Sequence, residues 1–245
     1  DYMKVQVKVY GSSTWNDLSG KFSGASQIWT NYIINLNNYS NQTVQVAFYF
    51  YSDNYYEHAG FYIDDISVDY TSNTDQLSLS SGWNLISFDV MKYQYSPESY
   101  FQPLISSNNL QMITGYQSQK GVFFDPNGLP FLNTLQSITA GEGYWVKLQN
   151  AATLTVEGFK YPPNFTIDLK EGWNLIGYWK EATTTPSQAF APLITAGVLQ
   201  MITGFDQGGK FFDPSGPPQF NTLTEIKNGL GYWVKVNIDY QDFGF

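Results

Sequence analysis

Cysteine is absent from the 245 residues, and the only histidine is His58. Without cysteine the chain forms no disulfide and offers no thiolate to a metal. One histidine cannot supply a histidine-based metal triad or a catalytic relay within one chain. Charged residues make up only 13% of the chain, and the 12 basic residues form no run. Scattered positive charge argues against nucleic acid and against an anionic membrane surface as partners. No apolar run approaches the roughly 20 residues that span a bilayer, so we expect no membrane insertion.

Aromatic and uncharged polar residues take the place of the missing charges. Aromatic residues reach 18% of the chain, hydrophobic residues 42%, and the net charge is −9. This composition is common in extracellular β-proteins and on sugar-binding surfaces, where ring faces contact the ligand and amides supply hydrogen bonds. The length suits two or three small domains. We therefore expect a β-rich protein that is extracellular, either secreted or on the cell surface.

The chain contains an internal repeat with a spacing of 88 to 90 residues. Five motifs recur in the same order: GWNLI at 82–86 and 172–176, LQMITG at 110–115 and 199–204, FFDP at 123–126 and 211–214, NTL at 133–135 and 221–223, and GYWVK at 143–147 and 231–235. An ordered match of this length indicates two copies of one structural unit. We predict three domains, which cover residues 1–72, 73–160 and 161–245.

Each copy has the pattern of a small β-rich α+β unit with one short helix. Thr185, Pro186 and Gln188 form an N-cap, a first helical position and a capping box, and Ser96 and Pro97 take the first two places in the other copy. Proline at 103 and 192 should end these helices. Strands are expected at GWNLI, around 112–113 and 122–124, at GYWVK, and at 152–156 in the first copy only. Residues 71–75 and 161–164 are expected to be linkers.

The N-terminal segment has a different pattern. Residues 2–10 alternate between apolar and polar side chains, as in a half-buried strand. Further strands are expected at 29–34, 43–50 and 60–68. The fold class is therefore mainly β: a partial β-sandwich followed by two tandem repeat domains.

Two resemblances to known families rest on these motifs. The segments STW at 13–15, VQVAFYF at 44–50 and AGFYIDDISV at 59–68 resemble the C-terminal half of a jelly-roll module of the MAM and immune-inhibitor-A type. The family's N-terminal strands are missing. The repeats resemble GWNLI…GYWV units of large exported bacterial and archaeal proteins, a family with no single activity to transfer. Together the resemblances imply an accessory region of a larger exported protein.

The sequence favours a non-catalytic protein. It has no nucleophile elbow, Walker loop or dinucleotide fingerprint. The carboxylate position that aligns in both copies is Asp125 with Asp213, and its Asp-Pro-x-Gly setting is that of a turn. Glu142 aligns with Leu230, so the repeat carries no acid pair of the kind a glycosidase needs.

An acidic cluster is the candidate ion site. The residues are Asp53, Glu57, Asp64 and Asp65. The jelly-roll resemblance implies a structural Ca²⁺ near the Ile-Asp-Asp strand, and Ca²⁺ takes six to eight oxygen ligands. The alternative is that Asp64 and Asp65 bond loop amides and bind nothing.

Three tryptophans are the ligand-binding candidates. Alternation along GYWVK places Trp145 on one side with Lys147, and Trp233 with Lys235, so these rings could be exposed. Tryptophan is retained in both copies at Trp83 and Trp173 and at Trp145 and Trp233, and such retention usually indicates a packing role instead. Trp179 aligns with Asp89, so the fold does not require a ring there, and it is a ligand or interface candidate.

Three functions remain open. The first is carbohydrate binding or adhesion, with a glycan or a cell-surface protein as partner. The second is a structural subunit or stalk of a surface layer or filament, assembled by strand complementation, with self-association through the N-terminal module. The third is an accessory domain of a secreted peptidase or glycoside hydrolase. We also expect the N-terminal module to be completed by contacts beyond its own residues, from another copy or upstream sequence rather than from the C-terminal tail.

Overall fold

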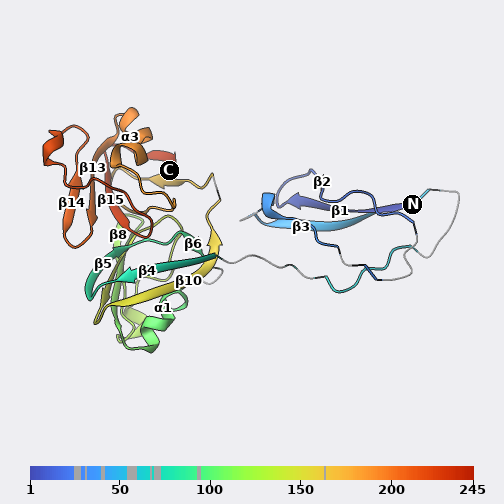
Figure 1. Cartoon of the computed structure of the whole chain (residues 1–245), viewed down its shortest axis with the longest axis horizontal. Helices are drawn as coiled ribbons and strands as arrows, with labels where there is room; N and C mark the ends of the chain where they lie inside the picture. Colours follow the sequence, from blue (N-terminus) through green and yellow to red (C-terminus); the bar gives the residue numbers. More distant parts are fainter. Residues whose placement is uncertain are drawn as a thin grey trace. The chain divides into compact units, whose positions relative to one another are not determined.

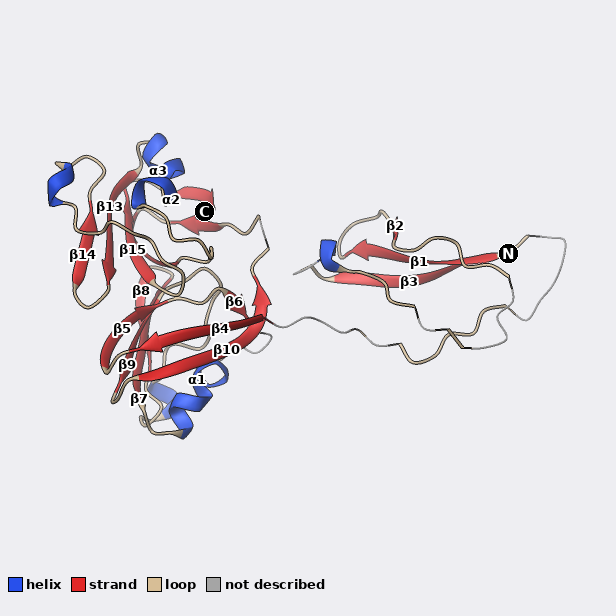
Figure 2. Cartoon of the chain, in the orientation of Figure 1, coloured by secondary structure: helices blue, strands red, loops and turns tan. Residues whose placement is uncertain are grey.

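The computed structural model describes residues 1–24, 29–30, 32–39, 42–53, 60–66, 68, 73–92, 95–162 and 164–245. The chain forms two compact units, Asp1–Tyr70 and Thr71–Phe245. Antiparallel strands dominate both units, so the prediction of a mainly β fold is confirmed (Figure 2). The second unit contains both predicted repeat domains. We call residues 73–160 the first segment and residues 161–245 the second segment.

The first unit is built around a three-stranded sheet of order β2-β1-β3. Its elements are β1 (Tyr2–Val9), β2 (Asn16–Asp17), the 3-10 helix η1 (Asn37–Tyr39) and β3 (Val44–Tyr51). The predicted alternation of β1 holds, because Val5 and Val7 are buried on one face. They lie opposite Phe48 and Val46 of β3.

Two strands predicted for the first unit are not found among its described residues. Residues 29–30 and 32–34 form no strand, and neither do residues 60–66 and 68. Asp65 has a φ of 52°, in the left-handed region that an extended strand cannot contain. The strand expected at 60–68 is therefore absent from the described residues of that segment.

The second unit carries the remaining elements. They are β4 (Asn73–Leu79), β5 (Gly82–Ile86), β6 (Val90–Met91), α1 (Pro97–Ser106), β7 (Leu110–Gln117), β8 (Lys120–Phe124), η2 (Pro130–Leu132), β9 (Tyr144–Leu148), β10 (Ala152–Lys160), β11 (Ile167–Leu169), β12 (Gly172–Gly177), α2 (Pro186–Ala189), α3 (Ala191–Thr195), β13 (Leu199–Phe205), β14 (Gly209–Phe212), η3 (Pro218–Phe220), β15 (Gly231–Val236) and β16 (Tyr240–Phe243). Figure 1 shows them along the chain.

Each segment contains a four-stranded sheet with the same strand order. The order is β5-β9-β7-β8 in the first segment and β12-β15-β13-β14 in the second. The register also matches: Trp83 lies opposite Lys147 in one sheet, and Trp173 lies opposite Lys235 in the other. Both sheets place a bulge at the start of the LQMITG strand. The matched motifs therefore occupy matched positions.

A second, smaller strand pair closes each segment. In the first segment β10 pairs with β4 and, at its end, with β6, and in the second segment β11 pairs with β16. Residues 73–75 thus begin a strand rather than a linker. The C-terminal tail, which supplies β16, serves the second segment: Phe243 is fully buried in its core. Strands β4 and β16 escaped the sequence analysis because most residues of β4 are polar and β16 has only four residues.

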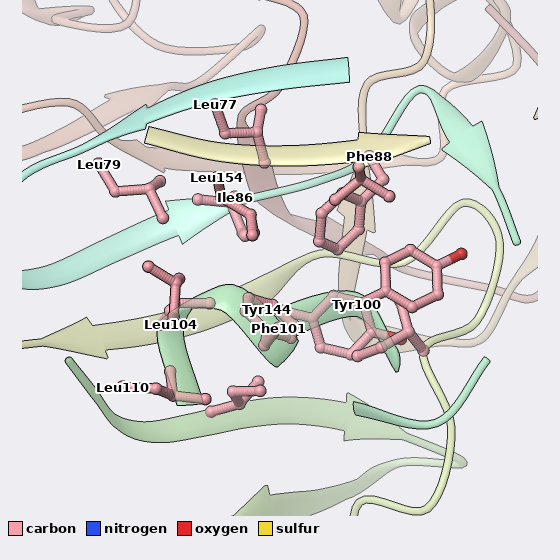
Figure 3. Close-up of a cluster of buried hydrophobic side chains, with 14 of the residues drawn as sticks. Leu77, Leu79, Ile86, Phe88, Tyr100, Phe101, Leu104, Leu110, Tyr144 and Leu154 are labelled. Atoms are coloured by element: carbon pink, nitrogen blue, oxygen red, sulfur yellow. The ribbon is translucent and has the colours of Figure 1, made fainter. Parts of the chain in front are cut away.

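The core of the first segment lies between its two sheets and α1. Figure 3 shows Tyr100, Phe101 and Leu104 of the helix converging with Ile86 and Leu154 of the strands. The inner face of the large sheet alternates as expected, so Tyr144, Val146 and Leu148 all point inward. The second segment has an equivalent core around Phe190, Tyr232 and Val234.

The helix caps follow the sequence, but one helix end does not. Ser96 caps α1, and Thr185 with Gln188 forms the predicted capping box of α2. Pro103, however, lies inside α1, which continues to Ser106. The carbonyl of Ser99, which would receive the N–H that proline lacks, accepts a hydrogen bond from Lys92 Nζ at 2.6 Å instead. In the second segment the helix is split, with Pro192 in the first turn of α3.

The two segments are joined by backbone hydrogen bonds at equivalent positions. The residues after GWNLI donate to the other segment: Ser87 N to Gly229 O at 3.0 Å, and Gly177 N to Gly141 O at 2.8 Å. At the centre, Gly143 and Gly231 face each other. A methyl group on Gly143 would lie 2.8 Å from the carbonyl oxygen of Ile176 and 3.3 Å from Cα of Gly231. Glycine is therefore required for this approach.

We predict that Gly143→Ala destabilises the second unit by about 1–3 kcal/mol, because the backbones must separate to admit the methyl group. Gly121→Ala is the control, since nothing lies within 4 Å of the added methyl on the exposed β8. Its effect should stay within about 0.5 kcal/mol. Urea unfolding at equilibrium measures both. Equal stability of the two variants would contradict the close contact.

Candidate functional site

The outer face of the first segment's large sheet carries an aromatic surface. Directly opposite residues on antiparallel strands share a face. One row across the sheet is Trp83, Lys147 and Met112, and the next is Leu85, Trp145, Thr114 and Phe123. We call Trp83, Lys147 and Phe123 the first platform. The matching residues Trp173, Lys235 and Phe211 form the second platform.

The first platform exposes two rings to solvent. Trp83 is 40% exposed and Phe123 is 36% exposed. The ring of Trp83 stands perpendicular to that of Trp145, with ring centroids 6.3 Å apart. Nζ of Lys147 lies 5.6 Å from the centroid of the Trp83 ring, within the range of a cation–π interaction. Both neighbours hold the Trp83 ring in a defined orientation.

The second platform repeats this geometry. Trp173 and Trp233 are also perpendicular with ring centroids 6.3 Å apart, and Nζ of Lys235 lies 5.9 Å from the centroid of the Trp173 ring. Trp173 is half-buried, whereas Trp83 is exposed. Phe211 is as exposed as Phe123, so the two rings of the platforms differ in exposure only at the tryptophan.

Trp145 and Trp233 bind the two segments together. Each ring lies on the outer face, as alternation predicted, but it contacts an aromatic ring of the other segment. Trp145 packs on Phe205, and Trp233 packs on Tyr116, with ring centroids 5.1 Å apart in both pairs. Both tryptophans are half-buried. Their ring faces are therefore partly used by the interface between the segments.

Trp179, the ligand or interface candidate at a strand end, is instead a core residue of the second segment. Only 5% of Trp179 is exposed. Its ring contacts those of Phe165 and Phe245, with centroid distances of 5.0 and 4.6 Å, and that of Tyr161 at 6.0 Å. The reason is the C-terminal tail, which brings Phe245 over the strand end.

Sequence reasoning overlooked Trp83 as the exposed ring. Alternation placed Trp145 beside Lys147, but the register of β5 on β9, which the sequence does not give, makes Trp83 the cross-strand partner of Lys147. Retention of Trp83 and Trp173 in both copies suggested packing, and for Trp83 that inference was incomplete.

Where the second segment buries Trp179, the first segment buries an acid pair. Asp89 occupies the position of Trp179, three residues after the GWNLI motif, and Asp75 occupies that of Phe165. Both aspartates are only 5% exposed. Asp89 pairs with Lys160 and accepts a hydrogen bond from Asn228 Nδ2 at 3.1 Å. Burial, together with the Asp89 carboxylate, raises the pKa of Asp75 to about 6.

Protonation of Asp75 would give this cluster the hydrogen-bond donor that it lacks. Oδ1 of Asp89 is buried and has no hydrogen-bond partner among the described residues. A buried acceptor without a donor costs free energy. The proton on Asp75 supplies a donor beside it, whereas the ionised form places two buried carboxylates together.

Glu142 forms a separate polar network at the segment interface. Its Oε2 accepts hydrogen bonds from Gln117 Nε2 at 2.7 Å and from the Tyr144 hydroxyl at 2.9 Å. Tyr144 in turn accepts from the Thr139 amide. Burial raises the pKa of the Glu142 carboxyl. The network fixes the loop that precedes Gly143, so it has a structural explanation.

The candidate calcium ligands are not brought together by the described residues. Asp53, Asp64 and Asp65 are exposed, and Glu57 lies outside the described residues. The Asp65 amide donates to Asp64 Oδ1 at 2.9 Å, the loop hydrogen bond of the alternative interpretation. Within the described part of the chain, no three His, Cys, Asp or Glu side chains form a group that could hold a metal.

No protein-family model, curated protein or solved structure matches the chain. None of the described helices has the length and apolar character that a membrane crossing requires.

The stability of the second unit should depend on the ionisation of Asp75. Its folded pKa of about 6 exceeds the unfolded value of about 3.9. Stability present at low pH is therefore lost as pH rises from about 4 to about 6, by at most about 1.4 kcal/mol per pH unit. Asp75→Asn should flatten this decline in urea unfolding measured against pH. Glu157→Gln, exposed on β10, should keep the wild-type slope, and a wild-type slope in Asp75→Asn would refute the assignment.

Proposed function

We propose that this chain is a non-catalytic accessory region of a secreted or cell-surface protein and that it binds carbohydrate through the first platform. The observation that carries the proposal is the exposed ring of Trp83 on a sheet face. An aromatic ring that is held in place offers an apolar face to the C–H groups of a sugar. Phe123 supplies a second exposed ring on β8, three strands from Trp83, and Thr114 supplies a hydroxyl in the same row as Phe123.

The sheet gives this surface rigidity. Trp83 and Phe123 lie on hydrogen-bonded strands rather than on loops, and Trp145 and Lys147 fix the Trp83 ring. Little conformational entropy is then lost when a ligand binds. The aromatic-rich, charge-poor composition and the resemblance to repeats of exported proteins support the same proposal, as they would support an accessory role beside a peptidase or glycoside hydrolase.

Trp83→Ala should weaken glycan binding at least tenfold, because removing an aromatic ring that the ligand covers costs about 2 kcal/mol of binding free energy. A glycan array identifies a binding polysaccharide, and its affinity is then measured with the immobilised polysaccharide. Trp15→Ala is the matched control, because Trp15 is 39% exposed but belongs to the first unit. This variant should bind the glycan as tightly as the wild type does. Absence of any bound glycan, or equal weakening in both variants, would contradict the proposal.

A structural role in a surface layer or filament is the second candidate. One observation favours it: apolar side chains of β3 are exposed on the first unit's sheet, although Val5 and Val7 on the same face are buried and Phe50 contacts Phe61. Val46, Phe48 and Phe50 of β3 share the face of Val5 and Val7 and are all exposed. An apolar sheet face of this kind favours association. The resemblance to half of a jelly-roll module supports completion by further strands.

We expect this chain to sediment as a dimer or larger species. Phe48→Lys, which puts like charges on the associating face, should shift it to monomer. Phe220→Lys replaces an exposed ring of the second unit and should leave the assembly intact. Sedimentation velocity of the three proteins is the measurement. A monomeric wild-type chain would remove the support for self-association.

A structural Ca²⁺ in the first unit remains part of the proposal, with Asp53, Glu57, Asp64 and Asp65 as its ligands. An ion that binds only the folded state raises the unfolding temperature. Melting in millimolar Ca²⁺ should therefore occur at higher temperature than melting in EDTA. Asp64→Asn with Asp65→Asn should abolish the difference, and identical wild-type curves would exclude the ion.

A further inference from the structure

The charge on the first platform is opposite to that of the chain. The whole chain has a net charge of −9, yet the one charged residue of this platform is Lys147. Among the described residues, Lys147 forms no ion pair, and its Nζ lies over the Trp83 ring. The platform therefore presents a cation beside a ring without a carboxylate to neutralise it.

The second platform differs in this respect. Lys235 lines an open hollow together with Glu171, Gln200 and Asn237. Glu171 directly precedes the second GWNLI motif, and the residue at the same place in the first segment is Ser81. A carboxylate near Lys235 lowers its attraction for an anion. Neither of the two matched lysines forms an ion pair with a described residue, but Lys235 shares a hollow with the Glu171 carboxylate.

We propose that the first platform binds an acidic sugar, one that carries a carboxylate or a sulfate, with the sugar ring on Trp83 and the anionic group on Lys147 Nζ. This inference rests on the proposed function and names the ligand class of the same surface. The cation–π contact holds the ammonium group beside the exposed ring, so a single pyranose that stacks on the ring places its substituent near the charge. Charge complementarity therefore distinguishes an acidic from a neutral glycan.

The test compares polysaccharides that differ only in charge. Polygalacturonate against its methyl ester measures the carboxylate, and dextran sulfate against dextran measures the sulfate. The wild type should bind the charged member of at least one pair at least tenfold more tightly, and added salt should reduce this preference. Lys147→Met keeps most of the side chain over Trp83 and should bind both members equally. Lys235→Met is the matched control and should keep the wild-type preference.

The outcomes separate the two proposals. Equal binding of both members that Trp83→Ala abolishes would uphold carbohydrate binding and refute the acidic ligand. A preference that survives in Lys147→Met, or that disappears in Lys235→Met, would also refute it. Binding to no member of either pair, while the glycan array identifies a neutral ligand, would refute the acidic sugar alone. Absence of binding in every assay would overturn both.

Discussion

The contact between Gly143 and Gly231 determines how the second unit is built. Without side chains at these two positions, the strands of the two large sheets approach closely enough for backbone hydrogen bonds between the segments. The close approach at Gly143 and Gly231 also brings the outer faces of the two large sheets into contact at one end. Leu85 is buried there, and Trp145 contacts Phe205. One row further along the sheet the faces diverge, and Trp83 and Lys147 stay accessible. The exposed platform is thus a consequence of where the glycines place the junction.

The two segments share this junction, but they bury different side chains just after the GWNLI strand. The first segment buries two aspartates with Lys160, whereas the second buries Trp179 among Phe165 and Phe245. The aromatic cluster gains stability from burial and ring contacts, less the cost of the Trp179 Nε1–H, which is buried without an acceptor among the described residues. A buried ionic cluster gains little net stability, and loses much if one partner is removed. The Asp89 carboxylate also bonds Asn228 of the other segment, so the polar cluster specifies how the segments meet.

Local patterns predicted the elements that local chemistry determines. Alternation in GYWVK and the cap residues Ser96 and Thr185 depend on neighbours within a few residues. The failures have a common physical origin in distant contacts. Burial of Trp179 depends on Phe245 at the other end of the segment, and Pro103 stays helical because Lys92 satisfies the Ser99 carbonyl. The strand expected at 60–68 has a residue with positive φ that no hydrophobic pattern reveals. The exposure of Trp83 required knowing which end of the sheet the partner segment covers.

The two platforms have the same ring geometry but differ in the charge around them, because packing at the junction constrains only some of their residues. Trp145 and Trp233 must both stay aromatic to fill the junction, and each supports the tryptophan beside it, so the geometry of both platforms is retained. Residues outside the junction carry no such constraint, which is why Ser81 in one segment stands where Glu171 does in the other. A single such difference changes the electrostatic potential around an otherwise identical lysine. Packing therefore preserves the arrangement of both surfaces, while the charge around them differs between the copies.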